Sequence, residues 1–134
     1  MQLGRRPATR KRVQSSTMGQ LTTHVLDISA GLPAAGVQIE LHELTPSSRL
    51  LLASVATGPD GRCPAPLIAG SGFHAGRYAL TFHVAAYFRA RGVTVAAPAF
   101  IEDAVINIGI AHPDQHYHVP LLISPWSYSV YRGG

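Results

Sequence analysis

An alternating run near the end of the chain constrains the fold more than any other sequence feature. Residues 115–123 read QHYHVPLLI, and from Tyr117 to Ile123 every second residue is apolar. This is the period of a β-strand that packs one face on a core. His116 and His118 occupy alternate positions, so we expect two imidazoles to point away from that core.

Similar short runs recur along the chain and are separated by glycine and proline. The chain has 13 glycines and 10 prolines, and turn residues at such close intervals are typical of a β-sandwich. Only residues 85–92, AAYFRARG, predict a helix, with glycine at its end. We therefore predict an all-β sandwich of about eight strands with one short helix. The expected strands are 21–28, 37–44, 49–57, a strand through 78–84, 104–110, 115–123 and 127–131.

The basic charge of the chain is concentrated at its start. With 134 residues the chain has the length of one domain. Its pI of about 9.7 would suit a nucleic-acid-binding protein, but five of the 11 basic residues lie within residues 1–20 and the seven acidic residues all lie beyond them. We predict a disordered basic extension over residues 1–20, a domain over residues 21–134, and no nucleic-acid partner. Met18 leaves a second start position open.

Apolar content and cysteine count limit the other classes of protein. No apolar run reaches the length of a signal peptide core or a membrane span, so we expect no membrane partner. The one cysteine, Cys63, excludes an internal disulfide and favours the cytoplasm. Hydrophobic residues make up 46% and charged residues 13%, which favours self-association.

Three separated motifs resemble the 5-hydroxyisourate hydrolase family, the transthyretin-like enzymes of urate breakdown. They are LTTHVLD with GLPA (21–27 and 31–34), DGR (60–62), and HYHVPLLISPWSYSVYRGG (116–134). The motifs occur in the family's order and together span residues 21–134. Chains of this family usually finish Tyr-Arg-Gly-Ser, whereas Gly134 stands here where they have serine. This chain therefore lacks the hydroxyl of that serine, and we still expect an active enzyme.

The resemblance implies a fold, a reaction and a site. The fold is a transthyretin-like sandwich, and the reaction is hydrolysis of 5-hydroxyisourate to 2-oxo-4-hydroxy-4-carboxy-5-ureidoimidazoline. His24, Arg62 and His118 take the positions of the family's active-site residues, and Tyr131 takes that of a residue contacting substrate. The resemblance also implies a homotetramer, a dimer of dimers with active sites at the interface between facing subunits, and no cofactor.

The chemistry of ring opening fits these residue types. Hydrolysis of an activated cyclic imide needs a group that takes a proton from water and a donor that stabilises the oxyanion. A histidine with a pKa of about 6.5 suits the first task and a permanently charged arginine the second. We expect His24 and His118 to position and deprotonate water, Arg62 to polarise the carbonyl, and Tyr131 to hold the ring. Which histidine is the base stays open.

Other interpretations compete with this one. His116 and His118 form a His-x-His pair that can bind zinc if a third ligand approaches, but no carboxylate or thiolate motif accompanies it, so we expect no metal. Cys63 follows Arg62, and neighbours on a strand face opposite ways, so we expect a buried, inert thiol. The remaining histidines that we expect at the surface are His42, His74 and His83. The alternative function is non-catalytic transport of a small ligand, as in transthyretin. A carrier does not need His24, Arg62 and His118 together.

Overall fold

The computed structural model describes residues 19–134. The predicted disordered extension therefore lies, up to residue 18, outside the described residues. Gly19 and Gln20, which we placed in that extension, already belong to the folded part. The amide of Gly19 donates a hydrogen bond of 3.0 Å to the carbonyl of Pro113, and Gln20 begins the first strand.

Short strands make up most of the described part of the chain, as the spacing of glycine and proline predicts. A single α-helix accompanies them within residues 19–134, and a 3-10 turn covers Gly70–Gly72. The elements are β1 (Gln20–Asp27), β2 (Leu32–Pro33), β3 (Gln38–Leu44), β4 (Arg49–Ala56), β5 (Ile68–Ala69), β6 (Gly76–Phe82), α2 (Val84–Ala90), β7 (Ala104–Ile110), β8 (His116–Ile123) and β9 (Tyr128–Val130).

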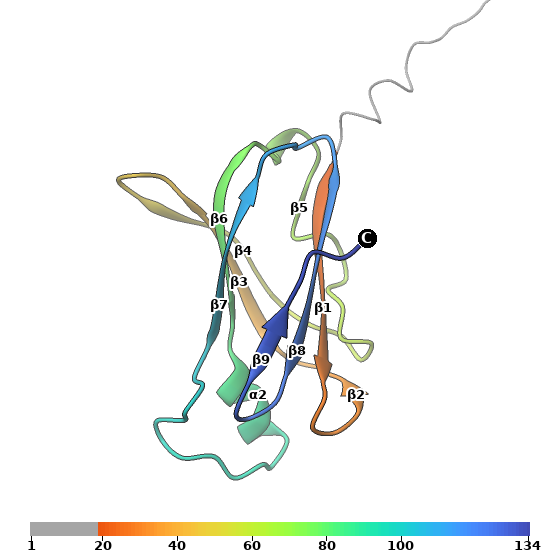
Figure 1. The fold of residues 1–134 in the computed structure, drawn as a ribbon, viewed down its shortest axis with the longest axis vertical. Coiled ribbons are helices and arrows are strands. Elements are labelled where there is room, and N and C mark those ends of the chain that lie inside the picture. Colours follow the sequence, from red (N-terminus) through yellow and green to blue (C-terminus); the bar gives the residue numbers. More distant parts are fainter. Residues whose placement is uncertain (1–18) are drawn as a thin grey trace, which may run out of the picture.

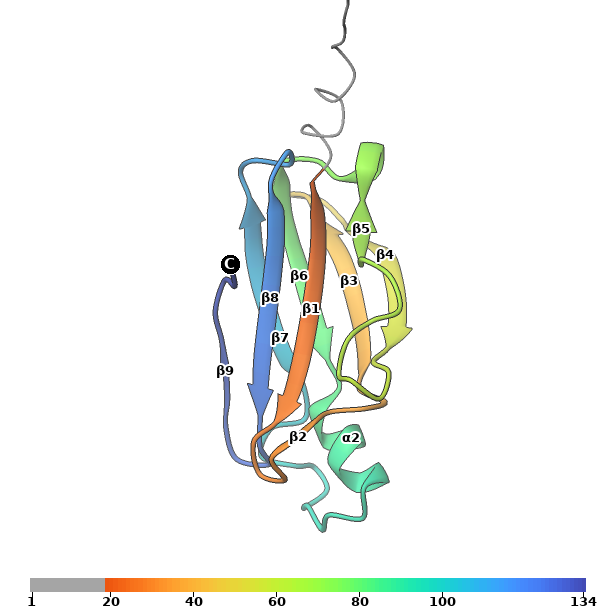
Figure 2. The ribbon, with the colours of Figure 1, turned by 90° about the vertical axis from the view of Figure 1, so that its right-hand side faces the viewer.

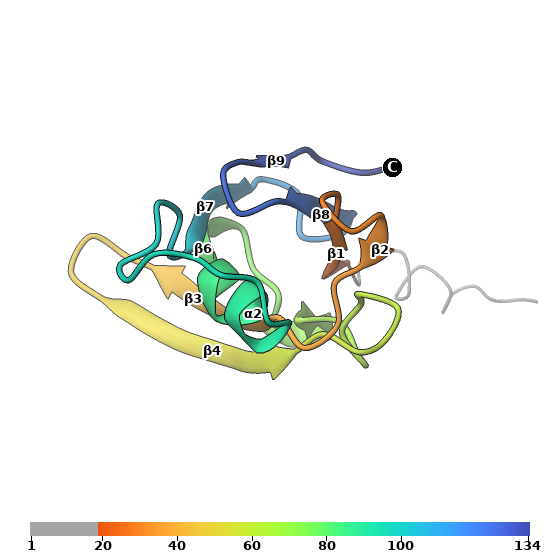
Figure 3. The same cartoon turned by 90° about the horizontal axis from the view of Figure 1, so that it is seen from below.

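Two sheets pack face to face, which confirms the predicted sandwich (Figures 1 and 3). One sheet has the order β2-β1-β8-β9 with β5 also paired to β1, and the other has the order β4-β3-β6-β7. The alternating apolar residues of each strand fill the space between the sheets. Ile39, Leu80 and Leu121 are fully buried there, and each contributes about 1.5–3 kcal/mol by leaving water. Helix α2 lies at one end of the two layers (Figure 1).

The structure corrects several predicted boundaries. The helix begins at Val84, which we placed in the preceding strand, because β6 ends at Phe82 and the backbone of His83 leaves the extended conformation. The strand predicted to reach Thr57 ends one residue earlier, since the Thr57 hydroxyl donates to the carbonyl of Ala34 in a turn. Strands β2 and β5 were not predicted, because two residues are too few to show a period.

The feature of the fold that matters most for a site is the pairing of β1 with β8. These strands lie side by side and run parallel (Figure 2). Their register places Thr22 beside His118 and Gln20 beside His116. Because side chains alternate along each strand, these residues share the outer face of the sheet. Within residues 19–134, no helix has the length and apolar content needed to cross a membrane.

Candidate active site

The outer face of the β1-β8 pair carries a row of polar side chains. Thr22 and His24 come from β1, and His116 and His118 come from β8. The inward residues between them, such as Tyr117, are buried in the core. The predicted outward orientation of the two β8 imidazoles is thus confirmed.

Arg62 reaches this row because a tight turn lies against the middle of β1. The amide of Val25 donates a 2.8 Å hydrogen bond to the carbonyl of Gly61, and His24 and Arg62 form an isolated antiparallel bridge. Gly61 has φ of +79°, and a Cβ there would lie 2.3 Å from the Val25 carbonyl oxygen. Only glycine fits both the dihedral and the space. The sequence DGR therefore places an arginine beside His24.

The final segment of the chain lies over His118 from the other direction. Gly133 donates a backbone hydrogen bond of 2.7 Å to the carbonyl of His118. A Cβ on Gly133 would lie only 2.8 Å from Cδ2 of the His118 ring. Arg132 holds this segment in place, since its guanidinium lies 4.0 Å from the centroid of the Tyr117 ring and donates to Gln115 Oε1.

A cavity of about 410 Å³ opens beside these residues. Its volume is within the range of small-molecule sites. Arg62 and His118 both line it, whereas His24 adjoins it through its bridge to Arg62. The full lining comprises Gln20, Thr22, Thr23, Arg62, Cys63, Pro64, Ala65, Pro66, His116, His118 and Gly134.

Tyr131, the fourth predicted site residue, lies apart from the other three within the single chain. It lines a second, more apolar cavity of about 450 Å³ with residues such as Ile106 and Val130. Its side chain is 60% exposed. One subunit thus brings together His24, Arg62 and His118, and the predicted substrate contact of Tyr131 remains a prediction.

The electrostatic environment of His118 favours its neutral form. Partial burial lowers its pKa below the usual 6.5, and the positive charge of Arg62 lowers it further, followed by His116 and His24. At neutral pH the imidazole is therefore uncharged and has a lone pair to accept a proton. This is the state that a general base requires.

The hydrogen bond of His24 fixes which of its nitrogens carries a proton. Its Nε2 lies 2.9 Å from the backbone carbonyl of Asp60. A carbonyl oxygen only accepts hydrogen bonds, so Nε2 carries the proton and the lone pair of the neutral ring is on Nδ1. His24 is thus held in a single tautomer by the turn that also delivers Arg62.

Sequence reasoning missed Thr22, whose hydroxyl lies 2.8 Å from His118 Nδ1 and 2.9 Å from His116 Nε2. The signal for it was present, since Thr22 precedes His24 by two residues and so shares its face. His116 was considered only as half of a zinc pair. Among residues 19–134, no three His, Cys, Asp or Glu side chains are grouped to hold a metal ion.

Contrary to our prediction, Cys63 does not lie buried on the face opposite to Arg62. Its side chain is half-buried and lines the same cavity as Arg62, because Arg62 forms only an isolated bridge and strand alternation does not apply there. Burial raises the pKa of the thiol, and the charge of Asp60 raises it further. The thiol is therefore protonated at neutral pH and a poor nucleophile.

Of three other histidines predicted to be surface residues, His74 is exposed, whereas His42 and His83 are half-buried. His42 Nδ1 is buried without a hydrogen-bond partner. His83 lies between two carboxylates, 2.9 Å from Asp103 and 3.8 Å from Glu40. Both therefore depart from the expectation of a simple surface position.

Comparison with known proteins shows which sequences this chain resembles. A family model described as HIUase/Transthyretin family matches residues 21–133. The 5-hydroxyisourate hydrolase of Pseudomonas aeruginosa is 51% identical over 116 residues, which cover 87% of this chain and 92% of that protein.

Two solved structures share the fold. The 5-hydroxyisourate hydrolase of Klebsiella pneumoniae superimposes with a TM-score of 0.73 at 36% identity, over 87% of this chain and 99% of that one. Sea bream transthyretin in complex with thyroxine superimposes with a TM-score of 0.76 at 31% identity, over 85% of this chain and 94% of that one.

Proposed function

The chain belongs to the HIUase/Transthyretin family, and we propose that it hydrolyses 5-hydroxyisourate to 2-oxo-4-hydroxy-4-carboxy-5-ureidoimidazoline in urate breakdown. One observation carries the proposal most strongly. A cavity of small-molecule size is lined by the neutral base His118 and the permanent cation Arg62, with His24 adjoining. Relatives that are 49–51% identical to this chain are named 5-hydroxyisourate hydrolase.

In this mechanism each side chain has a separate task. His118 and His24 hold the attacking water, and one of them takes its proton as the water oxygen bonds to the carbonyl carbon. Arg62 donates hydrogen bonds to the carbonyl oxygen as it gains negative charge. The carbonyl then re-forms as the carbon–nitrogen bond breaks, and the departing nitrogen takes a proton from the imidazole that deprotonated the water. These residues supply both catalytic functions without a metal or a covalent nucleophile.

The assembly we propose is a homotetramer built as a dimer of dimers. β7 and β9 are edge strands of the two sheets, and unpaired edges favour pairing with a second copy. Apolar side chains near the end of the chain also stand in solvent, with Trp126 71% and Tyr128 40% exposed. In the assembly, Tyr131 contacts substrate at the interface between facing subunits.

The compartment we propose is the cytoplasm. The one cysteine of the chain, Cys63, is a free thiol, and free thiols persist in a reducing environment.

A carrier of a small ligand is the second candidate, and the likeness to sea bream transthyretin with thyroxine favours it. A carrier does not require a neutral imidazole beside an arginine, so we rank it below the hydrolase. The two functions differ in turnover. A hydrolase consumes 5-hydroxyisourate with multiple turnovers, whereas a carrier leaves its ligand unchanged.

The decisive experiment generates 5-hydroxyisourate in place with urate oxidase and follows its ultraviolet absorbance. We expect the purified chain to accelerate the decay at substoichiometric concentration, and to do so equally after treatment with a strong chelator. Decay at the spontaneous rate with folded protein present would exclude the hydrolase and promote the carrier. Loss of activity that zinc restores would show that the histidine pair binds a required metal.

The assembly is tested by light scattering combined with the rate across a dilution series. We expect a tetramer, with a specific activity that falls as the tetramer dissociates. A fully active monomer would refute the shared active site.

A further inference from the structure

The hydroxyl of Thr22 connects two imidazoles on the outer face of the sheet. Its Oγ1 lies 2.8 Å from Nδ1 of His118 and 2.9 Å from Nε2 of His116. Both distances are those of good hydrogen bonds. A hydroxyl has a single proton, so it donates to one imidazole and accepts from the other. The three side chains therefore share their protons in an ordered chain.

Only two arrangements satisfy both hydrogen bonds while the imidazoles are neutral. In the first, His118 Nδ1–H donates to Thr22, and Thr22 donates to His116 Nε2. In the second, every donor and acceptor is reversed, and His118 carries its proton on Nε2. Only the first arrangement leaves a lone pair on His118 Nε2, the ring nitrogen that no other described residue engages.

The packing around His118 keeps its ring in one orientation. Gly133 lies against Cδ2 so closely that there is no room for a Cβ, and its amide binds the His118 carbonyl. Gly133 thus fixes the plane of the ring, and exchanging its Nδ1 and Cδ2 edges would put a carbon beside the Thr22 hydroxyl and break that hydrogen bond. Nδ1 therefore stays with Thr22.

The charged and titratable groups that act on His118 are Arg62, His116 and His24. Among residues 19–134, no carboxylate hydrogen-bonds to its ring. In a serine hydrolase triad an aspartate orients the histidine and selects its tautomer. Here the only side chain in that position is a neutral hydroxyl.

We propose that Thr22 is a positioning residue that holds His118 with its proton on Nδ1 and passes that proton on to His116. The proposal rests on the hydrolase function above. His118 Nε2 takes a proton from water as the water O–H bond breaks and the oxygen bonds to the carbonyl carbon. The Nδ1–H proton of His118 moves to Thr22 Oγ1, and the Thr22 proton moves to His116 Nε2. His116 is exposed and releases the proton to solvent. When the carbon–nitrogen bond breaks, His118 Nε2–H gives its proton to the departing nitrogen, and the transfers run back through Thr22 as His116 takes a proton from solvent.

Thr22→Val removes the hydroxyl at nearly constant volume, and Thr22→Ser retains it. The matched control is Thr81→Val in β6, a strand of the other sheet. This change removes a buried hydroxyl that has no hydrogen-bond partner. Each variant is tested for kcat and KM and, with ¹⁵N-labelled histidine, for the tautomer of His118 by long-range proton–nitrogen NMR. The signals of His118 are assigned by their loss in His118→Asn.

We expect the wild type to show a protonated Nδ1 on neutral His118. Thr22→Val should lower kcat roughly tenfold with little change in KM, and should shift His118 toward the Nε2–H tautomer. Thr22→Ser should restore both, and Thr81→Val should alter neither. His116→Phe should lower kcat to a similar degree, with no further loss in the double variant with Thr22→Val.

An unchanged tautomer and unchanged kcat in folded Thr22→Val would overturn the proposal. So would a loss in Thr22→Val that Thr22→Ser does not restore, because the hydroxyl would then not be the cause. The NMR measurement does not depend on turnover. An inactive wild type would therefore refute the proposed function, while the response of the tautomer to Thr22→Val would still decide the role of Thr22.

Discussion

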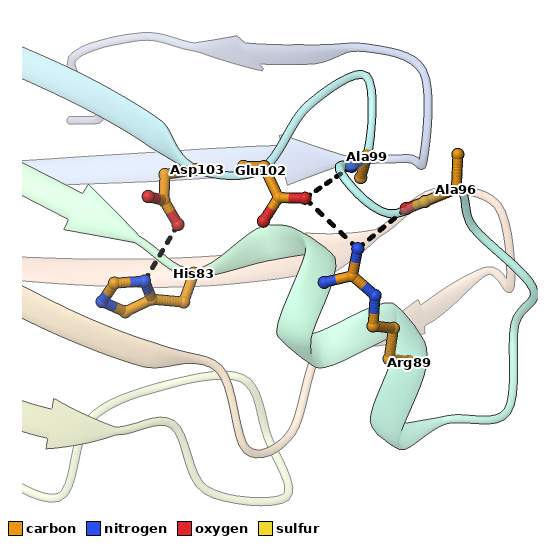
Figure 4. A network of polar contacts seen from close by, with 6 residues as sticks. All are labelled: His83, Arg89, Ala96, Ala99, Glu102 and Asp103. Atoms are coloured by element: carbon orange, nitrogen blue, oxygen red, sulfur yellow. Dashed lines mark hydrogen bonds and ion pairs between the residues drawn. The ribbon is translucent and has the colours of Figure 1, made fainter.

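Two histidines in this molecule lie in opposite electrostatic surroundings. His118, on the outer face of β8, has Arg62 and other imidazoles around it. His83, at the start of α2, lies 2.9 Å from Asp103 (Figure 4) and 3.8 Å from Glu40. A cation beside an imidazole favours its neutral form, whereas carboxylates act as partners for a protonated ring. The same residue type thus lies beside a cation in one place and beside two carboxylates in the other.

A second set of polar contacts lies near His83 at the same end of the sandwich. The side chain of Arg89 in α2 donates to Glu102 at 3.2 Å and to the carbonyl of Ala96 at 2.8 Å, and Glu102 also accepts from the amide of Ala99 (Figure 4). These contacts join the helix to the loop before β7. Every charge in this network has a partner, and no residue of it lines the cavity beside His118.

The largest effect that would test this contrast is on turnover. His118→Asn removes the proposed base, and we expect kcat to fall roughly a hundredfold to ten-thousandfold with the fold retained. His83→Asn should keep about the wild-type rate, and should lower stability by about 1 kcal/mol or less, as for other exposed ion pairs. Steady-state kinetics and circular dichroism of both variants measure this. Equal losses of activity in the two variants would show that the contrast has no functional meaning.

A second effect concerns the cation. Arg62→Gln removes the proposed oxyanion donor, and we expect kcat to fall about a hundredfold to a thousandfold. Because Arg62 lowers the pKa of His118, its removal should raise that pKa. The acid limb of the rate profile should then move to higher pH, since His118 protonates earlier on acidification. Asp103→Asn, near His83, is the control and should leave the limb in place. A limb that does not move in Arg62→Gln would assign the limb to another group.

Part of the fold and of the candidate site could be predicted from the sequence, and part could not. The sandwich and the outward face of β8 followed from the alternation, and the motifs identified His24, Arg62 and His118. Alternation cannot show which strands are neighbours, so the parallel pairing that brings Thr22 to His118 was invisible. The position of Cys63 depended on the turn before it, whose path no periodicity encodes.

A third effect concerns the close contact between Gly133 and His118. Gly133→Ala places a methyl group about 2.8 Å from His118 Cδ2, so either the ring or the end of the chain must shift. We expect kcat to fall roughly tenfold with little change in melting temperature, because a small displacement of a catalytic group is costly. Gly72→Ala is the matched control, since its Cβ would meet nothing within 4 Å. Kinetics and thermal melts of both variants test this expectation. Full activity in Gly133→Ala would show that the contact with Gly133 does not position His118.

The smallest effect separates the two regions by pH. The pKa of folded His118 lies below the 6.5 of an unfolded imidazole, chiefly through burial. The unfolded chain therefore binds more protons, and stability from His118 is lost as pH falls below about 6.5. In the other network, hydrogen bonds from the Ala99 amide and then from Arg89 lower the pKa of Glu102 below 4.5. The contribution of Glu102 to the free energy of unfolding is therefore present above about pH 4.5 and is lost only as the pH falls below that value.

Urea unfolding between pH 8 and pH 3 distinguishes these two windows. His118→Asn should flatten the dependence of unfolding free energy on pH between about pH 7 and pH 5 without altering the decline below about pH 4.5. Glu102→Gln should do the reverse. If His118→Asn left the upper slope unchanged, the imidazole would not be held neutral in the folded protein, and the contrast between the two histidines would lose its physical basis.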